Sequence, residues 1–525
     1  MKQTKQDSVF TTKPIGSGTE GDISSGTGSK STTEPQELDM KATKRLLRKI
    51  DIHILPIMCL ICLLCFLDRA NIGNARLDNL ELDLRLVGLQ YNDCLAVLFP
   101  FYIAAEIPSN MMMKRIQPST WLAFIMFAWS TCIIGQGFVK NYEGLMVTRG
   151  LLGLFEGGFF PGINFYITQW YRRNECGLRM AIIFSSATLA GAFGGLLARG
   201  IAEMSGVGGL SAWSWIFIIE GLASIVVSIL AYWTVYGYPA SARFLTATER
   251  YEVQRRLSVD SGPLSDDFDI KYVYQALVDW KIYIHMLICM AGFCPVYSFS
   301  LFLPTIVKNM GYSANNAQLM TVPPYVLACI FTISASMLAD RCHQRGVFLL
   351  VLQLGAILGL SLLASSANPI IQYTGTIFAA IGIYPQIPLG LAWNGNNIGG
   401  SLKRATGIAM QVMGGNCGGI IASYVYLNRD APRYIIGHSI LIGFVRLVPP
   451  LKHPLTPSYD CLLSNPHPHC SMAFILTLFM TTWCRRENVR RDTIAREAAS
   501  NEPTLEQKML EHDLADGVSW FRYTV

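Results

Sequence analysis

Four charged side chains lie inside long apolar stretches of the first third of the sequence: Asp68, Arg69, Arg149 and Glu156. If these stretches cross a membrane, each charge costs at least about 2.5 kcal/mol and needs a partner or a wet cavity. Arg149 and Glu156 are seven positions apart, which places them on one face of a helix. Burial favours the protonated form of a carboxylate and a nearby arginine opposes it, so this quartet can exchange protons while an anion docks on a guanidinium. Structural salt bridges are the alternative interpretation.

The second half of the sequence supplies polar groups without charge. The stretch LGLAWNGNNIGG (Leu389–Gly400) is followed by Gln411 and Asn416 in the next apolar run. Amide side chains offer both hydrogen-bond donors and acceptors, which suits the far end of a small polar ligand. Hydrogen bonds between membrane helices explain the same amides equally well. Tyr102 and Tyr297 can line the same cavity, although ordinary packing is the better explanation for both.

The composition excludes several classes of protein. Of the 525 residues, 51% are hydrophobic and 15% are charged, whereas soluble globular proteins carry about 25% charged residues. The net charge of +6 is too small to indicate a nucleic-acid partner. The sequence lacks the Gly-Lys-Ser/Thr ending of an ATP-binding loop, a catalytic dyad and a His/Cys metal set. We therefore expect no enzyme activity, no cofactor and no metal.

Apolar runs long enough to cross a bilayer, which takes about 20 residues, recur along the whole chain. They lie near 51–72, 92–113, 119–139, 144–169, 179–203, 213–236, 282–306, 321–340, 346–366, 370–393 and 406–427, and a last, broken run lies between 435 and 484. This pattern predicts an all-α integral membrane protein with twelve transmembrane helices in two pseudo-symmetric six-helix bundles. The expected parts are a disordered cytosolic tail (1–40), the first bundle (41–237), a cytoplasmic linker (238–281), the second bundle (282–484) and a cytosolic tail (485–525).

Lysine and arginine are unevenly divided between the connections, and an excess of them marks the cytosolic side of a membrane protein. The even-numbered connections are rich in both, with the charged linker and Lys114, Arg115, Arg172, Arg173, Arg179, Arg341, Arg345, Lys403 and Arg404. The opposite connections hold fewer: Arg76, Arg85, Lys140, Lys308, Arg429 and Arg433. Both termini are therefore expected in the cytosol.

Several longer motifs are more specific than composition. They are FLDRANIGNARL (Phe66–Leu77), RGLLGLFEGGFFPG (Arg149–Gly162), SSATLAGAFGGLLA (Ser185–Ala198), WSWIFIIEG (Trp213–Gly221), DAPRYIIGH (Asp430–His438) and RRENVRRD (Arg485–Asp492). In combination they closely resemble the fungal anion:cation symporter family of the major facilitator superfamily, which includes allantoate and nicotinate permeases. The resemblance covers about residues 40–495. It implies the major facilitator fold; we also expect a functional monomer, most simply in the plasma membrane.

The same resemblance implies roles for individual residues. In bacterial relatives of this symporter class, the acids that match Asp68 and Glu156 couple transport to protons. The arginine that matches Arg69 holds the substrate carboxylate, and we expect Arg149 to assist it. An asparagine in this part of the tenth span faces the substrate, which makes Asn394 the candidate here.

The stretch ADRCHQR (Ala339–Arg345) resembles the D-R-x-x-x-R element that locks the two halves of major facilitator proteins in one state. It implies a conformational lock made by Asp340, Arg341 and Arg345. Asp340 can receive either an arginine or the N-terminal end of a neighbouring helix. The equivalent place after the second span lacks the acid–arginine pair, which departs from the superfamily motif and matches the family.

The last span is interrupted by RLVPPLKHPLTPSYDCLLSNPHPHC (Arg446–Cys470), which holds six of the 24 prolines of the chain. So many prolines cannot form a spanning helix, and neither flank alone reaches the length of a span. We hypothesise that 446–470 is a translated intron retained in a gene model. A genuine loop is the alternative, in which His467, His469, Cys461 and Cys470 resemble metal ligands.

These observations together favour a proton-coupled symporter that imports a small organic anion. The expected partners are the anion, protons and the lipid bilayer, and the preferred substrates are nicotinate, allantoate and pantothenate-like vitamins. A proton-driven exporter of a drug or secondary metabolite uses the same fold, and a nutrient receptor that does not transport is the third possibility. Fold-level analogy does not decide the substrate.

Overall fold

The computed structural model describes residues 40–261, 270–399, 401–443, 472–498 and 522–525. Within these ranges the regular elements are all helices. Almost all of the expected N-terminal tail (1–40), and the whole of the suspected insertion (446–470), lie outside the described residues.

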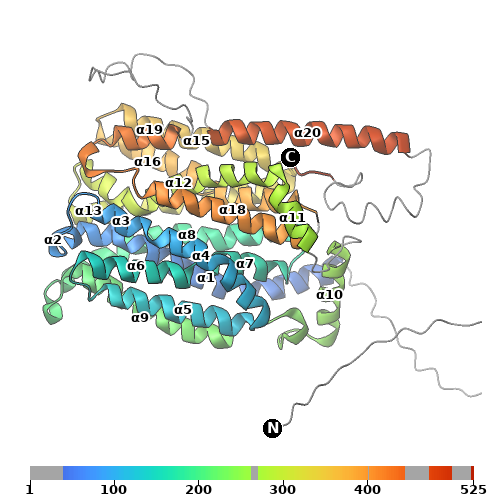
Figure 1. Cartoon of the computed structure of the whole chain (residues 1–525), viewed down its shortest axis with the longest axis horizontal. Helices are drawn as coiled ribbons and strands as arrows, with labels where there is room; N and C mark the ends of the chain where they lie inside the picture. Colours follow the sequence, from blue (N-terminus) through green and yellow to red (C-terminus); the bar gives the residue numbers. More distant parts are fainter. Residues whose placement is uncertain (1–39, 262–269, 400, 444–471, 499–521) are drawn as a thin grey trace, which may run out of the picture.

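The first half of the chain forms one bundle of long, roughly parallel and antiparallel helices (Figure 1). Its helices are α1 (Met40–Leu77), α2 (Leu80–Asp83), α3 (Gln90–Ala96), α4 (Leu98–Arg115), α5 (Pro118–Gln136), α6 (Tyr142–Glu156), α7 (Phe159–Thr168), α8 (Arg173–Ile201), η1 (Ala202–Met204), η2 (Val207–Gly209) and α9 (Ala212–Thr234). Helix α1 packs on α8, α5 on α9, and α4 on α6.

A connection with η3 (Pro239–Ser241), α10 (Ala247–Ser261) and α11 (Ile270–Val278) leads to the second half. Its helices are α12 (Trp280–Asn309), α13 (Ala314–Met320), α14 (Val322–Cys342), α15 (Arg345–Ser365), α16 (Pro369–Ile383), α17 (Gln386–Asn396), α18 (Ser401–Ala422), η4 (Asn428–Asp430), α19 (Ile435–Gly443) and α20 (Met472–Ala498). Here α12 packs on α18, α15 on α19 and α20, and α14 on α16. These pairs repeat those of the first half in the same order along the chain, as internal repeats require.

Nine helices or helix pairs in the described part of the chain are long and apolar enough to cross a membrane. The other three expected spans have identifiable irregularities. Helices α6 and α7 are separated at Gly157 and Gly158, where a Cβ would collide with Tyr102 O or Ser109 Oγ of α4. Helix α18 carries Lys403 and Arg404 in its first turn and several glycines after them, and α19 and α20 flank residues outside the description.

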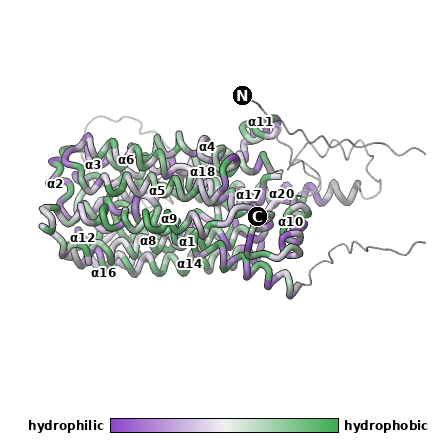
Figure 2. The backbone as a smooth tube through the Cα atoms, turned by 90° about the horizontal axis from the view of Figure 1, so that it is seen from below, coloured by the Kyte–Doolittle hydropathy of each residue, from purple (hydrophilic) through white to green (hydrophobic). Residues whose placement is uncertain are grey.

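We call the end of the molecule that holds α10 and α11 the linker end, and the end that holds α2 and α13 the distal end (Figure 1). Hydrophilic residues gather near α10 at the linker end, whereas hydrophobic residues run along the body of the bundles (Figure 2). This distribution of polar and apolar residues is the one expected of a protein whose body crosses the apolar layer of a membrane and whose ends reach the polar surfaces.

Helices α19 and α20 both pack along α15 and follow one another along the same side of the second bundle (Figure 1). Helix α19 has 9 residues, too few to cross a bilayer. Together with the apolar first half of α20 it has the length of one span. The position of the two helices is thus compatible with a single span divided by the segment 444–471.

A chain without Arg446–Cys470 is expected to unfold several degrees above the full chain, because α19 can then continue into α20 as one helix. About 1 kcal/mol shifts the midpoint of a domain of 150–250 residues by roughly 2–4 °C. Thermal unfolding of the two purified proteins in detergent measures the difference. An equal or lower midpoint for the shortened chain would show that the segment belongs to the native protein, and transcript sequencing gives an independent answer.

Candidate functional site

A buried ion pair between α1 and α6 forms the centre of the candidate site. Arg69 Nη2 and Nε donate to the same oxygen of Glu156, Oε1, at 2.6 and 3.1 Å. Cys65 Sγ also donates to this oxygen, at 2.8 Å. The other oxygen, Oε2, has no hydrogen-bond partner in the described part of the chain. Arg69 is therefore neutralised by Glu156, and one oxygen of the acid is left where a proton can be held.

Aromatic rings surround the guanidinium of Arg69. Its Cζ lies 5.3 Å from the ring centre of Phe66, 4.9 Å from that of Tyr102 and 5.5 Å from that of Tyr297. Arg69 Nη1 donates to the hydroxyl of Tyr297 at 3.0 Å, and this hydroxyl donates to Asn416 Oδ1 at 2.9 Å. Because Tyr297 belongs to α12 and Asn416 to α18, the chain of hydrogen bonds joins the two bundles. Packing alone does not account for Tyr297.

Arg149 is buried in α6, at 1% exposure, and forms no ion pair with another residue in the described ranges. Its Nε and Nη2 have no hydrogen-bond partner among the residues that the structure describes. A charged group removed from water without a partner is costly. Arg149 therefore provides a guanidinium ready for an anion, whereas Arg69 becomes available only when it leaves Glu156.

Asp68 lies inside the first bundle, on the side of α1 that faces α5 and α9. Its Oδ2 accepts from Trp129 Nε1 at 3.2 Å and from Ser224 Oγ at 3.1 Å. One turn away on α9, Glu220 accepts a hydrogen bond from Asn71 and interacts electrostatically with Asp68. Asp68 thus takes its hydrogen bonds from α5 and α9, has a second carboxyl group as a neighbour, and still lies within electrostatic range of Glu156 and Arg149.

Two buried acids were missed in the sequence, Glu106 and Glu220, at 0% and 2% exposure. Glu106 lies one turn from Tyr102 on α4, and neither of its carboxyl oxygens has a hydrogen-bond partner in the described ranges. The side chains of Asn416 in α18 and Cys289 in α12 lie close enough to influence its carboxyl group, so it faces the second bundle. In the sequence, each of these acids is a single charged residue within an apolar run, and this pattern could have identified both as candidate site residues.

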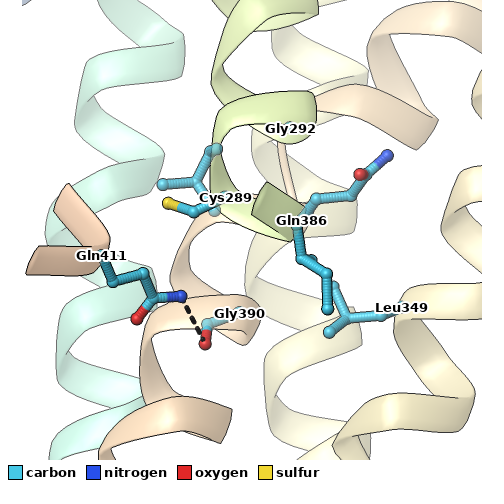
Figure 3. Close-up of a pocket in the computed structure, with 8 residues that line it drawn as sticks. Cys289, Gly292, Leu349, Gln386, Gly390 and Gln411 are labelled. Carbon is cyan, nitrogen blue, oxygen red and sulfur yellow. Dashed lines mark hydrogen bonds between the residues drawn. The ribbon is translucent and has the colours of Figure 1, made fainter. Parts of the chain in front are cut away.

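Asn394 is buried in α17, where its Nδ2 donates to Gln411 Oε1 of α18 at 2.8 Å. The asparagine thus makes a helix–helix hydrogen bond, one of the two roles open to it. Gln411 lines a cavity of about 10 Å³ inside the second bundle, with Cys289 and Gln386 on other walls (Figure 3). This is the space of about one water molecule, so the cavity does not hold a substrate in this conformation.

The predicted lock lies at the linker end. Arg345 Nε and Nη2 donate to Asp340 Oδ1 at 3.1 and 2.5 Å, and Nη1 donates to the carbonyl oxygen of Ala392 in α17 at 2.8 Å. A Cβ on Gly177, in the first turns of α8, would lie 2.6 Å from Arg345 Nη2. The pair therefore contacts the first bundle at the N-terminal end of a helix. Arg341 is exposed and takes no part in this pair.

The bundles also touch at the distal end. Asn92 Nδ2 donates to the carbonyl oxygen of Ser423 at 2.6 Å, and the hydroxyl of Tyr424 donates to Asp93 Oδ1 at 2.6 Å. Nearby, burial raises the pKa of Asp78 to about 6, although Gln318 and Lys308 of the second half oppose this. With contacts at the linker end, the distal end and the Arg69–Tyr297 bond between them, the conformation is closed at both ends.

Replacing Asp340 by asparagine is expected to open the linker end about fivefold more often, since a partly exposed ion pair contributes up to about 1 kcal/mol. Cys342 and Ser241 are both exposed. Spin labels on Cys342 and on a cysteine introduced at Ser241 report the distance between the bundles by double electron–electron resonance spectroscopy. Arg341→Gln is the matched control and should leave the distances unchanged. Equal distance distributions for Asp340→Asn and the native chain would show that Asp340 does not hold the linker end closed.

Within the described residues, no group of three or more His, Cys, Asp or Glu side chains is arranged to hold a metal ion. The side chains that meet at the candidate site carry guanidinium, carboxyl, phenol and amide groups. These groups bind anions and exchange protons.

A family model, related sequences and solved structures all match this chain to transporters. The family model described as Major Facilitator Superfamily matches residues 58–423. An uncharacterized transporter of Schizosaccharomyces pombe is 37% identical, over 81% of this chain and 85% of its own. A high-affinity nicotinic acid transporter of Saccharomyces cerevisiae is 33% identical, over 76% of this chain and 75% of its own. The xylose transporter XylE from E. coli, in a partially occluded inward open conformation, shares the fold with a TM-score of 0.58 and 14% identity, over 77% of this chain and 99% of that one.

Proposed function

The chain belongs to the major facilitator superfamily, and we propose that this multi-pass membrane protein imports a small organic anion together with protons. The observation that carries the proposal is Arg149, a buried guanidinium whose Nε and Nη2 have no partner in the described part of the chain. An unpaired buried cation next to a second, paired one is a site prepared for an anion.

Proton coupling follows from competition for Arg69. In this closed conformation Nε and Nη2 of Arg69 both donate to Glu156 Oε1. A proton on Glu156 Oε2 cancels the charge of the acid and weakens its hold on Arg69. The substrate carboxylate then takes the two N–H groups that Glu156 leaves, in the bidentate geometry that guanidinium and carboxylate prefer. Anion and proton thus need each other at the site, which is the requirement of symport.

The charge balance supports the same mechanism. Four carboxyl groups (Asp68, Glu106, Glu156 and Glu220) and two guanidinium groups (Arg69 and Arg149) are buried within α1, α4, α6 and α9. The acids outnumber the bases by two before an anionic substrate is added. Because unpaired charges are costly in a membrane, protons are the ions that neutralise the excess. We assign proton coupling to Glu156 and Asp68, and Asp68 holds its proton at Oδ1, which has no partner within the described ranges.

Alternating access requires that the contacts at the two ends break in turn. We assign the linker end, with its many lysines and arginines, to the cytosol, together with both termini, and we place the protein in the plasma membrane. Anion and protons enter after the contacts of Asn92 and Tyr424 open. They leave after Asp340, Arg345 and Gly177 separate.

The substrate that we favour is a small carboxylate such as nicotinate, followed by allantoate and pantothenate-like compounds, since one relative is a nicotinic acid transporter. The aromatic rings around Arg69 suit a flat ligand. Uptake of the three radiolabelled compounds, at acidic and neutral pH, into cells without their own permeases tests the proposal. Acid-stimulated accumulation that an uncoupler abolishes supports it. No uptake of any despite surface expression would contradict it for these compounds and favour export.

A further inference from the structure

The residues Arg522–Val525 lie at the linker end, where they contact Lys281 of α12, Trp393 of α17 and Asn488 of α20 (Figure 1); we call this contact surface the docking site. Two asparagine side chains hold the backbone of this segment. Asn397, the residue that caps the C-terminus of α17, accepts from Thr524 N at 2.6 Å and donates to Thr524 O at 3.1 Å. Asn488 of α20 accepts from Tyr523 N at 2.9 Å and donates to Tyr523 O at 2.8 Å. Both peptide groups of two successive residues are therefore satisfied by side chains, which fixes the register of the segment.

Tyr523 is the anchor of the segment, with 5% of its surface exposed. Its ring centre lies 5.1 Å from that of Trp483 in α20. The hydroxyl accepts from Lys281 Nζ and Arg491 Nη2, each at 3.1 Å, and Lys281 Nζ and Arg491 Cζ lie 5.1 and 4.7 Å from the ring centre. A buried aromatic side chain between two cations and a tryptophan is the type of contact that dominates binding energy at interfaces.

The docking site shares one turn of helix with the lock. Trp393 Nε1 of α17 donates to the carbonyl oxygen of Thr524 at 2.7 Å. The preceding residue, Ala392, accepts the hydrogen bond from Arg345. The end of α17 is thus held from one side by Arg345 and from the other by the segment, and α17 itself packs against α8 of the first bundle.

We propose that the docking site is an intramolecular peptide-binding site for Arg522–Val525, and that its occupation holds the linker end closed. While the segment is bound, Trp393 and Asn397 keep the end of α17 against α8. When the segment leaves, this end of α17 loses three hydrogen bonds to it, and the linker end opens more readily. The segment is in this way a regulatory latch, whatever substrate the protein carries.

The test compares the full chain with Tyr523→Ala and with Arg522→Ala. The control is matched, because Arg522 belongs to the same segment, is exposed and pairs at the surface with Asp492, at 2.8 Å, a contact that contributes little. Spin labels on Cys342 and at Ser241 measure the opening of the linker end without any substrate. Tyr523→Ala should raise the open population several-fold, and Arg522→Ala should leave it unchanged.

A second measurement does not depend on the folding of Tyr523→Ala. A chain that lacks 522–525 is titrated with a synthetic peptide of residues 519–525 (SWFRYTV). The peptide should bind and restore the closed distances, whereas the same peptide with alanine at the tyrosine position should bind at least about tenfold more weakly. Closed distances in the shortened chain without peptide, or equal binding of both peptides, would overturn the proposal.

Discussion

Replacing Glu156 by glutamine should remove the pH dependence of anion binding and abolish proton-driven accumulation. The glutamine keeps the shape of the acid and carries no charge, so Arg69 loses the competitor that holds its Nε and Nη2. Binding should then be as tight at neutral pH as at acidic pH. Because no proton is taken up with the anion, the substrate can only equilibrate, and exchange of substrate across the membrane should persist.

Anion binding to the purified Glu156→Gln protein over a range of pH, together with uptake and exchange in proteoliposomes, measures these effects. Cys65→Ala is the control, since it removes a neutral donor to the same Glu156 oxygen and leaves the charge competition intact. The empty Glu156→Gln protein should also unfold more readily, because a buried ion pair that loses one member costs about 3–5 kcal/mol. Accumulation driven by a proton gradient in Glu156→Gln would refute the coupling role of this residue.

Replacing Arg149 by glutamine should weaken anion binding by roughly 100-fold. Hydrogen bonds to charged groups contribute about 1.5–3 kcal/mol each, and the loss of about 2.7 kcal/mol corresponds to a factor of 100. The same change should leave the empty protein as stable as before, or stabilise it, because Arg149 Nε and Nη2 have no partner in the described part of the chain. Arg69→Gln should instead destabilise the protein, since it leaves Glu156 without its cation.

Isothermal titration calorimetry of anion binding and thermal unfolding, both carried out on the two variants, separate the roles of the arginines. Arg199→Gln is the control for loss of a positive charge, because Arg199 pairs with Glu203 at the surface of α8, at 2.9 Å. If Arg149→Gln binds the anion normally and lowers the unfolding temperature, Arg149 has a structural role and the site must be sought elsewhere.

Much of the fold was predictable because apolar length decides where a helix crosses a membrane. The expected major facilitator fold is confirmed, with nine of the spans evident by length and composition in the described residues. The break at Gly157 and Gly158 was not predictable. It depends on the backbone of α4, which must come close enough for Tyr102 O to exclude a Cβ.

The residue types of the site could be predicted from the sequence, but which side chains contact one another could be predicted only in part. The sequence indicates Arg149 and Glu156 on one helix face, yet the acid pairs with Arg69 of another helix. It cannot show which face of α4 meets the second bundle, and that face is what makes Glu106 part of the region. Asn394 has the same ambiguity, because a buried amide serves a ligand or a neighbouring helix equally well, and here it bonds Gln411.

The most direct test of proton-coupled anion import is the simultaneous flux of both species. Proteoliposomes with the chain lacking Arg446–Cys470 and a trapped pH-sensitive dye are given an inward gradient of the anion that the uptake screen identifies. The interior should acidify as the anion enters, and Glu156→Gln should show no acidification. Anion entry at the native rate with no change of internal pH, or with alkalinisation, would contradict symport.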